Sequence, residues 1–70
     1  METGPVIHLN GIPHALPSGG SVLSLLQNLG LDNVPVLVEH NATALFPREF
    51  PDTILKAGDR LEIIRIVAGG

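Results

Sequence analysis

The sequence predicts a small α+β domain in which a mixed β-sheet carries one helix on one face. Three observations predict this fold class: an apolar helical stripe that begins at Val22, a β-branched strand at residues 36–40, and a strongly apolar strand at residues 61–67. A chain of 70 residues has room for one domain with one modest core. We therefore expect a single domain at residues 1–67 and a flexible tail at residues 68–70.

The composition narrows the class of protein. Hydrophobic residues make up 44% and charged residues 16%, which is typical of a chain that folds. The absence of cysteine excludes a disulfide framework, a thiolate nucleophile and sulfur ligands for zinc. The net charge of −3 disfavours nucleic acid as a partner. The chain starts without a signal-peptide pattern and has no run of about 18 apolar residues, so we expect a cytoplasmic location and no membrane partner.

The first expected elements are two strands joined by a tight turn. Residues 6–9 form a short apolar run that ends at Asn10-Gly11, a dipeptide that favours a hairpin turn because both residues tolerate positive φ. Residues 13–16 form the second strand. Since Pro13 has no amide donor, it belongs at the start of a strand or on a sheet edge.

The helix follows the break at Gly19-Gly20. Ser21 can cap it by accepting from the free amides of the first turn. An apolar stripe with i, i+3, i+4, i+7 spacing predicts that one helical face lies on the sheet; its members are Val22, Leu25, Leu26 and Leu29. Gly30 can end the helix in the left-handed conformation, which gives a length of about nine residues.

The second half of the chain contains two further strands and two short elements. Residues 36–40 predict a buried strand, residues 44–46 a short apolar segment closed by Pro47, and residues 51–55 one helical turn with Leu55 pointing inward. After a turn at residues 57–59, five of the seven residues at 61–67 are Leu, Ile or Val, so this strand should be central. The resulting order of elements is that of the β-grasp fold.

The last strand predicts a surface for a partner. Because side chains alternate between the two faces of a strand, Ile64 and Ile66 should lie opposite Leu61, on the face away from the helix. Two exposed aliphatic side chains near the chain end indicate a docking surface. The alternative is that Phe46 and Phe50 fold over them and complete a second apolar cluster.

The tail carries the chemistry. Gly69 and Gly70 follow the last strand with only Ala68 between them and Val67. A segment without side chains can thread a narrow channel, and its terminal carboxylate is open to attack. A carboxylate is a poor electrophile, so another protein must activate it, for example as an acyl-adenylate that a sulfur nucleophile displaces. The alternative is a frayed chain end.

Four segments carry a resemblance to a known family. Residues 59–70 read DRLEIIRIVAGG, residues 6–11 end in Asn-Gly, residues 22–29 match a helix, and residues 46–49 read FPRE. Together they resemble the ThiS family of thiamine-pathway sulfur carriers over nearly the whole chain. The sequence departs from the family pattern at residues 41–45 and in the extra residues before Pro5, which leaves the pairing of the third strand open.

The resemblance implies a function and its partners. In that family the terminal glycine, here Gly70, is adenylated with ATP by a ubiquitin-activating-like, ThiF-like adenylyltransferase. It then becomes a thiocarboxylate, which is a covalent 1-thioglycine, with sulfur from a cysteine desulfurase system, and supplies sulfur to a ThiG-like thiazole synthase. The chain itself would be no enzyme and would bind no cofactor or metal. The residues expected to contact partners are Phe46, Arg48, Ile64, Arg65, Ile66, Val67 and Ala68.

Three alternatives remain open. The chain could be the small subunit of molybdopterin synthase, although its length and Arg48 favour ThiS, or a ubiquitin-like modifier whose tail is joined to lysines. A hydrolytic or metal enzyme built on His8, His14 and His40 is disfavoured, because they occupy three separate elements without helical i, i+4 spacing.

The remaining polar residues receive structural interpretations. We expect His8 and His40 to be sheet neighbours with solvated or hydrogen-bonded rings. Asp59 should shape the turn before the last strand, and Glu39 and Glu49 should be solvated.

Overall fold

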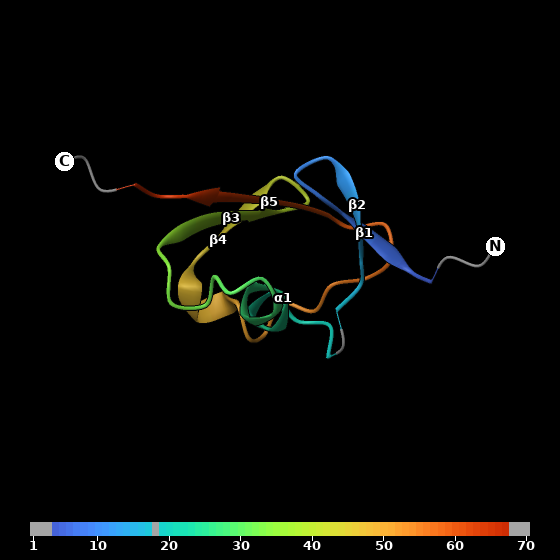
Figure 1. The fold of residues 1–70 in the computed structure, drawn as a ribbon, viewed down its shortest axis with the longest axis horizontal. Helices are drawn as coiled ribbons and strands as arrows, with labels where there is room; N and C mark the ends of the chain where they lie inside the picture. Colours follow the sequence, from blue (N-terminus) through green and yellow to red (C-terminus); the bar gives the residue numbers. More distant parts are fainter. Residues whose placement is uncertain (1–3, 18, 68–70) are drawn as a thin grey trace.

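The protein is a five-stranded mixed sheet with one helix packed against one face (Figure 1). The computed structural model describes residues 4–17 and 19–67. The strand order is β2-β1-β5-β3-β4, which confirms that the last strand is central and that the fold is β-grasp. The elements are β1 (Val6–Leu9), β2 (Ile12–Ala15), α1 (Val22–Asn28), β3 (Val36–His40), β4 (Thr43–Leu45), the 3-10 turn η1 (Pro47–Glu49) and β5 (Arg60–Arg65).

The β1–β2 hairpin closes with the predicted two-residue turn. Asn10 and Gly11 have φ values of 51° and 83°, the double positive φ of a type I′ turn. Strand β2 begins one residue earlier than predicted and forms an edge of the sheet. Pro13 therefore lies on an outer strand, opposite His8, as its missing amide requires.

Helix α1 begins at Val22, directly after Ser21, the residue predicted to cap it. The hydroxyl of Ser21 accepts from the amide of Ser24 at 3.0 Å, and the hydroxyl of Ser24 accepts from the amide of Ser21 at 3.1 Å. Gly30 has a φ of 74° just past the helix end, as predicted. The helix is 7 residues long, shorter than expected. It ends before Leu29, which is 37% exposed, so the prediction that Leu29 lies on the sheet is wrong.

The core lies between α1 and the sheet. Strands β1, β3 and β5 and helix α1 each contribute side chains, and two more come from the connection between β4 and β5. The buried residues are Ile7, Val22, Leu25, Leu26, Val38, Phe50, Leu55, Leu61 and Ile63. The inward position of Leu55 is confirmed.

The predicted helical turn at residues 51–55 is wrong. The turn forms earlier, as η1, because Pro47 starts it with a fixed φ and Glu49 Oε1 accepts from the amide of Phe46 at 2.7 Å. Further on, Ile54 forms an isolated bridge with Ser21, so this stretch is held extended. Glu49 is half-buried and closes the turn, which corrects its interpretation as a solvated charge.

Strand β5 pairs on both sides. It runs parallel to β1 and antiparallel to β3, and it ends at Arg65, two residues before the predicted end. Ile66 lies beyond the strand, although its amide still donates to the carbonyl of Pro35 at 3.0 Å. Within the described residues, no helix combines the length and apolar character that crossing a bilayer requires.

Strand β3 has the predicted bounds. Residues 41–45, which depart from the family pattern, form the turn and the second strand of a hairpin with β3. Asn41 and Ala42, with φ values of 50° and 71°, make a two-residue turn into β4, which pairs antiparallel with β3. Ala42 is exposed and holds a conformation that disfavours any side chain with a Cβ.

Replacing Ala42 by glycine should therefore stabilise the protein. Removing the Cβ relieves the positive φ, and we expect a gain of about 0.5–1 kcal/mol in the free energy of unfolding, measured by urea denaturation. The matched control is Ala44→Gly, the same change at an exposed position inside β4, which should destabilise by about 0.5–1 kcal/mol. A loss of stability in Ala42→Gly would contradict the strained turn.

Candidate functional site

The candidate functional region that the structure describes is the base of the tail, which consists of Arg65, Ile66 and Val67. Ala68, Gly69 and Gly70 lie outside the described residues, so the predictions made for them stay predictions. The last described residue, Val67, is 86% exposed. It follows Ile66, the first residue after the central strand β5, so the central strand of the sheet leads towards the chain end (Figure 1).

The face of the sheet opposite α1 carries an exposed apolar pair. Leu37 on β3 lies directly opposite Ile64 on β5, and the two side chains are 58% and 56% exposed. The exposure predicted for Ile64 is confirmed. Leu37 was missed because residues 36–38 are all apolar and suggest burial on both faces. Its alternation with Glu39, which shares the same face, is the signal that could have found it.

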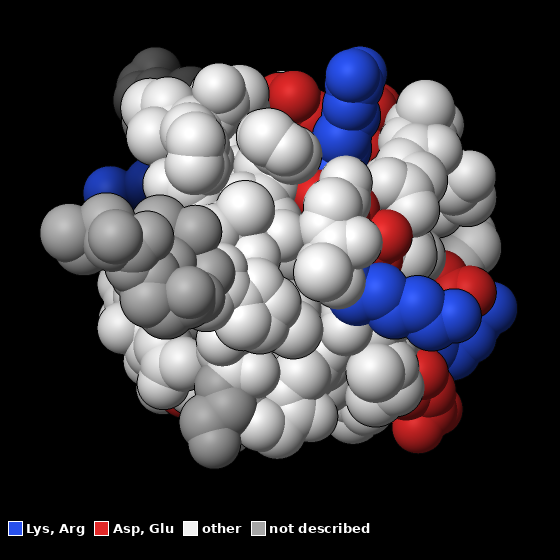
Figure 2. Space-filling model, turned by 90° about the vertical axis from the view of Figure 1, so that its right-hand side faces the viewer, with Lys and Arg blue, Asp and Glu red and all other residues white. Residues whose placement is uncertain are grey.

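Charged residues continue this face away from the chain end. Glu39 lies opposite Glu62, next to Leu37 and Ile64, and both carboxylates are exposed, as predicted for Glu39. Arg60 follows on the same strand face. Figure 2 views the end of the molecule that lies on the right in Figure 1, and there Lys and Arg side chains lie beside Asp and Glu side chains over part of the surface. Along β5 this face therefore changes from charged residues, Arg60 and Glu62, to the apolar Ile64 nearest the base of the tail.

Ile66 does not share the surface of Ile64, and that prediction is wrong. Ile66 lies past the end of the β5 ladder, where pairing no longer enforces alternation. It borders a hollow formed mostly by residues on the α1 side, which are Leu23, Asp32, Val34, Pro35, Val36, Pro47 and Phe50. Ile64 borders a different hollow with Glu39 and Arg60.

The two phenylalanines do not cover Ile64. Phe50 is buried in the core beneath α1 and reaches only the hollow beside Ile66. Phe46 is exposed, and the guanidinium carbon of Arg48 lies 4.7 Å from the centroid of its ring, a cation–π contact. The alternative of a second apolar cluster over Ile64 is therefore wrong.

Arg65 lies on the other face from Ile64. The register pairs Arg65 with Val36, which lies on the same face of β3 as the core residue Val38. Arg65 therefore lies on the α1 side of the sheet, where it is exposed. The predicted partner residues thus do not form one face. Ile64 lies on one face of β5, whereas Arg65 and the hollow beside Ile66 lie on the α1 side.

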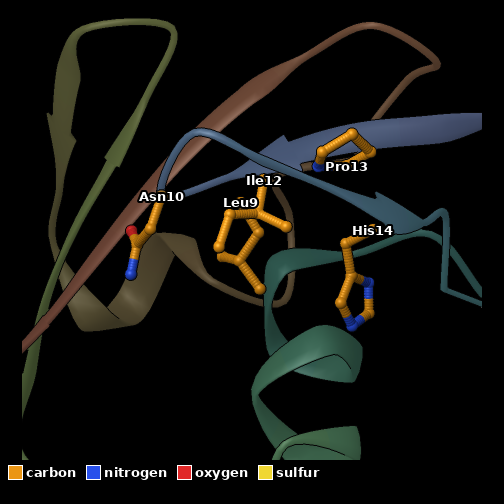
Figure 3. A pocket seen from close by; sticks show the side chains of 5 residues that line it. All are labelled: Leu9, Asn10, Ile12, Pro13 and His14. Carbon is orange, nitrogen blue, oxygen red and sulfur yellow. The ribbon is translucent and has the colours of Figure 1, made fainter.

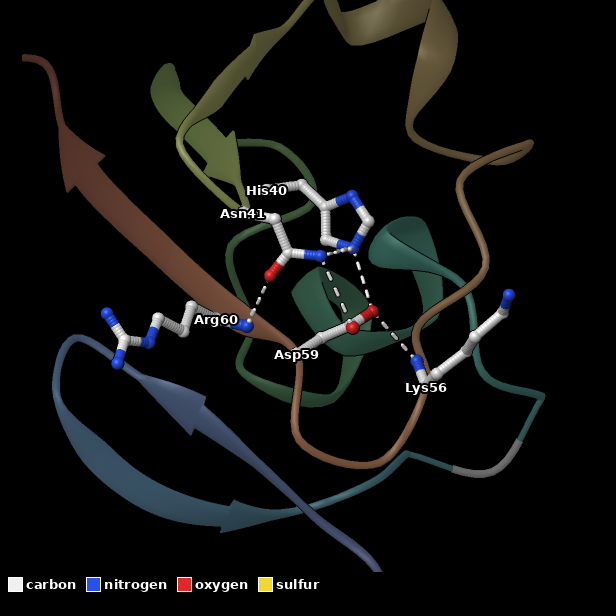
Figure 4. A network of polar contacts seen from close by, with 5 residues as sticks. All are labelled: His40, Asn41, Lys56, Asp59 and Arg60. Carbon is white, nitrogen blue, oxygen red and sulfur yellow. Dashed lines mark hydrogen bonds and ion pairs between the residues drawn. The ribbon is translucent and has the colours of Figure 1, made fainter.

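A polar network fixes the start of β5 (Figure 4). One oxygen of Asp59 lies 2.8 Å from Nε2 of His40 and accepts from the amide of Lys56 at 2.9 Å. The other accepts from the side-chain amide of Asn41 at 3.3 Å, while Asn41 Oδ1 accepts from the amide of Arg60 at 2.9 Å. Asp59 therefore shapes the turn, as predicted, and ties it to the β3–β4 hairpin.

This network also sets the pKa of Asp59. Partial burial acts to raise the pKa, but the hydrogen bonds from His40, Lys56 and Asn41 outweigh it and lower the pKa below the ordinary value of 3.8. A carboxyl whose pKa is lower in the folded state stabilises the protein above its unfolded pKa. That contribution is lost as the pH falls through the folded pKa.

We therefore expect Asp59→Asn to remove part of the acid dependence of stability. Between about pH 5 and pH 2 the wild-type free energy of unfolding should fall more steeply than that of Asp59→Asn. Urea denaturation at closely spaced pH values measures both slopes. Asp52→Asn, a change of an exposed carboxyl outside the network, is the control and should keep the wild-type slope. Equal slopes in all three proteins would contradict the network.

The histidines do not form one site. Strand β5 separates β1 from β3, so the prediction that His8 and His40 are sheet neighbours is wrong. His8 is opposite Pro13, which puts His14 on the other face of the hairpin. His14 borders a small hollow with Leu9 and Ile12 (Figure 3). No group of three metal-ligating side chains occurs in the described part of the chain.

The five-stranded mixed sheet with one helix on one face defines the class of small β-grasp proteins. The family model of the ThiS family matches residues 7–70. The chain belongs to the ThiS family.

Individual relatives agree with this family. A thiazole synthase of Magnetococcus marinus is 33% identical over 64 residues, 91% of this chain; the chain spans 20% of the length of that protein. The sulfur carrier protein ThiS of Thermus thermophilus is 32% identical over 65 residues, 93% of this chain and 100% of that protein. The crystal structure of the thiamine biosynthesis protein ThiS from Geobacter metallireducens superposes with a TM-score of 0.76 at 29% identity, covering 93% of this chain and 99% of that one. These matches support a sulfur carrier role in thiamine biosynthesis.

Proposed function

We propose that this chain is a sulfur carrier for thiazole formation in thiamine biosynthesis and that Gly70 carries the sulfur as a thiocarboxylate. One observation carries the proposal: the central strand β5 leads through an exposed Val67 directly into Ala68-Gly69-Gly70. The family model extends to that last glycine. The family match also favours this role over that of a molybdopterin synthase subunit or a ubiquitin-like modifier.

The first step is activation of the carboxylate by a ThiF-like adenylyltransferase. A carboxylate oxygen of Gly70 attacks the α-phosphorus of ATP, and pyrophosphate leaves with the electron pair of the broken P–O bond. The product is an acyl-adenylate whose carbonyl carbon is electrophilic. The chain contributes only its terminus to this step, which is why we propose that it is a substrate of the enzyme and not an enzyme itself.

The second step exchanges oxygen for sulfur. A persulfide supplied by a cysteine desulfurase system attacks the carbonyl carbon, and AMP leaves to give an acyl disulfide. A thiol then attacks the sulfur of that disulfide that is not bonded to the carbonyl carbon. The S–S bond breaks, the thiocarboxylate leaves with its electron pair, and the thiol forms a new disulfide with the sulfur that it attacked. The result is 1-thioglycine at Gly70, with no cofactor bound to the chain.

The thiocarboxylate would then supply its sulfur to a ThiG-like thiazole synthase. The relative from Magnetococcus marinus supports this partner, because one chain named thiazole synthase contains a segment similar to the present protein. Frequent sulfur delivery from the carrier to the synthase would favour joining the two proteins in one chain.

The residues around the base of the tail would position the terminus. Gly69 and Gly70 have no Cβ, so they can enter a channel that excludes other residues. The exposed pair Leu37 and Ile64 provides apolar contact area, with Arg65 on the opposite side of β5. Further contacts would come from residues nearer the tail and from η1, namely Phe46, Arg48, Ile66, Val67 and Ala68.

Intact-mass spectrometry tests this function. The full chain is incubated with a ThiF-like adenylyltransferase from the same cell and MgATP, and we expect a species that carries one adenylyl group on Gly70. The control replaces ATP by its α,β-methylene analogue, in which a P–C bond stands in place of the P–O bond that must break. This analogue should give no adenylate. An unmodified mass with ATP, under conditions in which the two proteins form a complex, contradicts the proposal.

A further inference from the structure

One edge of β5 is paired for most of its length. Odd-numbered residues of the strand direct their backbone groups towards β1. The carbonyl of Asp59 accepts from the amide of His8 at 2.8 Å, and the carbonyl of Leu61 accepts from the amide of Asn10 at 2.8 Å. Strand β1 ends at Leu9 and the chain turns back, so β1 offers no further backbone partner.

The side chain of Asn10 supplies the next pair of bonds. Its Oδ1 accepts from the amide of Ile63 at 2.8 Å, and its Nδ2 donates to the carbonyl of Ile63 at 3.1 Å. Asn10 lies at the hairpin turn beside β5 (Figure 3). The carboxamide thus occupies the place of one more strand residue and closes the edge as far as Ile63.

Beyond Ile63 this edge is open. On the other side of β5, the amide of Asn41 donates to the carbonyl of Arg60 and the amide of Ile66 to the carbonyl of Pro35, at 2.9 and 3.0 Å. Even-numbered residues therefore bond to β3, and the amide and carbonyl of Arg65 face the opposite side. Neither group has a hydrogen-bond partner within residues 4–17 and 19–67.

We propose that an extended segment of the activating adenylyltransferase adds to β5 as a short strand along this open edge, from Arg65 to Val67. The inference rests on the proposed function, because that enzyme must receive the chain end. An unpaired strand edge is a template for pairing with another chain. Asn10 limits the added strand to the last residues of β5, next to the tail.

Strand addition at this position explains how a terminus without side chains can be positioned in an active site. Backbone pairing fixes the direction of Arg65 to Val67 without requiring particular side chains from either partner. Because Ala68-Gly69-Gly70 follows at once, the same bonds set where the carboxylate enters the active site. We expect the adenylyltransferase to occupy this open edge of β5. The alternative is that a second copy of this chain occupies it.

Amide hydrogen exchange, measured by NMR on the full ¹⁵N-labelled chain, tests this inference. In the free protein the amide of Arg65 should exchange faster than those of Ile64 and Ile66, which face β3. Adding the ThiF-like adenylyltransferase with the α,β-methylene analogue of ATP should slow exchange at Arg65 by about tenfold or more. Adenylation with ATP is measured in a parallel sample.

Each other outcome has a definite meaning. An unprotected Arg65 amide in a sample whose parallel reaction forms adenylate overturns strand addition and leaves the proposed function intact. Absence of both complex and adenylate contradicts the proposed function and the inference with it. Protection that rises with the concentration of this chain alone identifies a second copy as the occupant and overturns the inference.

A pair of variants gives an independent test. Arg65→Pro removes the amide donor without touching a bond to β3, whereas Arg65→Ala removes the same side chain and keeps the donor. We expect the kcat/KM of adenylation for Arg65→Pro to be about tenfold below that for Arg65→Ala, with similar melting temperatures. Equal values overturn the inference. Should Arg65→Pro fail to fold, an ester in place of the residue 65 amide, introduced by chemical synthesis, removes the same donor.

Discussion

Adding one alanine after Gly70 is expected to abolish sulfur loading. The extra residue moves the carboxylate by about 3.3–3.6 Å along an extended chain and places a Cβ on the residue that must enter the active site. A misplacement of about 1 Å can already cost about 100-fold in rate, so the kcat/KM of adenylation should fall by about 100-fold or more. Pyrophosphate release gives the rate, and intact mass gives the product.

The control for this extension inserts the same alanine between Met1 and Glu2. The two proteins then have the same composition and mass, and only the position of the added residue differs. The control should be loaded at the wild-type rate. If the protein extended after Gly70 delivers sulfur as well as this control, the terminal carboxylate of Gly70 is not the carrier group.

The second large effect is expected in the core, at Leu61. This side chain is fully buried on β5 beneath α1, and Leu61→Ala should cost about 2–5 kcal/mol. A domain of 70 residues has a total stability of roughly 4–10 kcal/mol, at about 0.05–0.15 kcal/mol per residue. A large part of the stability is therefore lost, which urea denaturation followed by circular dichroism will measure.

Ile64→Ala is the matched comparison, three residues further along the same strand. Ile64 is more than half exposed, so the free energy of unfolding should change by less than about 1 kcal/mol. Adenylation should instead become less efficient, by about tenfold in kcat/KM, because the partner loses an apolar contact. If Ile64→Ala destabilises the fold as much as Leu61→Ala, or adenylation is unchanged, Leu37 and Ile64 are not the docking surface.

Local signals predicted most of the fold. The bounds of β3 follow from an apolar run between Pro35 and Asn41, and the start of α1 follows from the cap at Ser21. The errors lie where a second local signal overrides the first. Leu29 matches the helical stripe, but the helix ends first, and the turn expected at residues 51–55 is replaced by η1 because Pro47 and Glu49 favour it.

The site was predictable only in part, because its residues are brought together by the pairing of the whole sheet. Alternation along β5 identified Ile64, but the sequence does not state where the ladder ends, and Ile66 lies beyond it. Which strands are neighbours is likewise a property of the whole sheet, so the separation of His8 from His40 and the bond pair between Asn10 and Ile63 had no local signal. Leu37 had one, in its alternation with Glu39.

The central claim is that the carboxyl group of Gly70 carries sulfur in the cell. The most direct test is the intact mass of the protein purified from its native cell during thiamine synthesis, with fragmentation to locate any change. The account predicts a species heavier by the difference between one sulfur and one oxygen atom, with that difference confined to Gly70. A population that is entirely unmodified, or joined to lysines of other proteins, would contradict it.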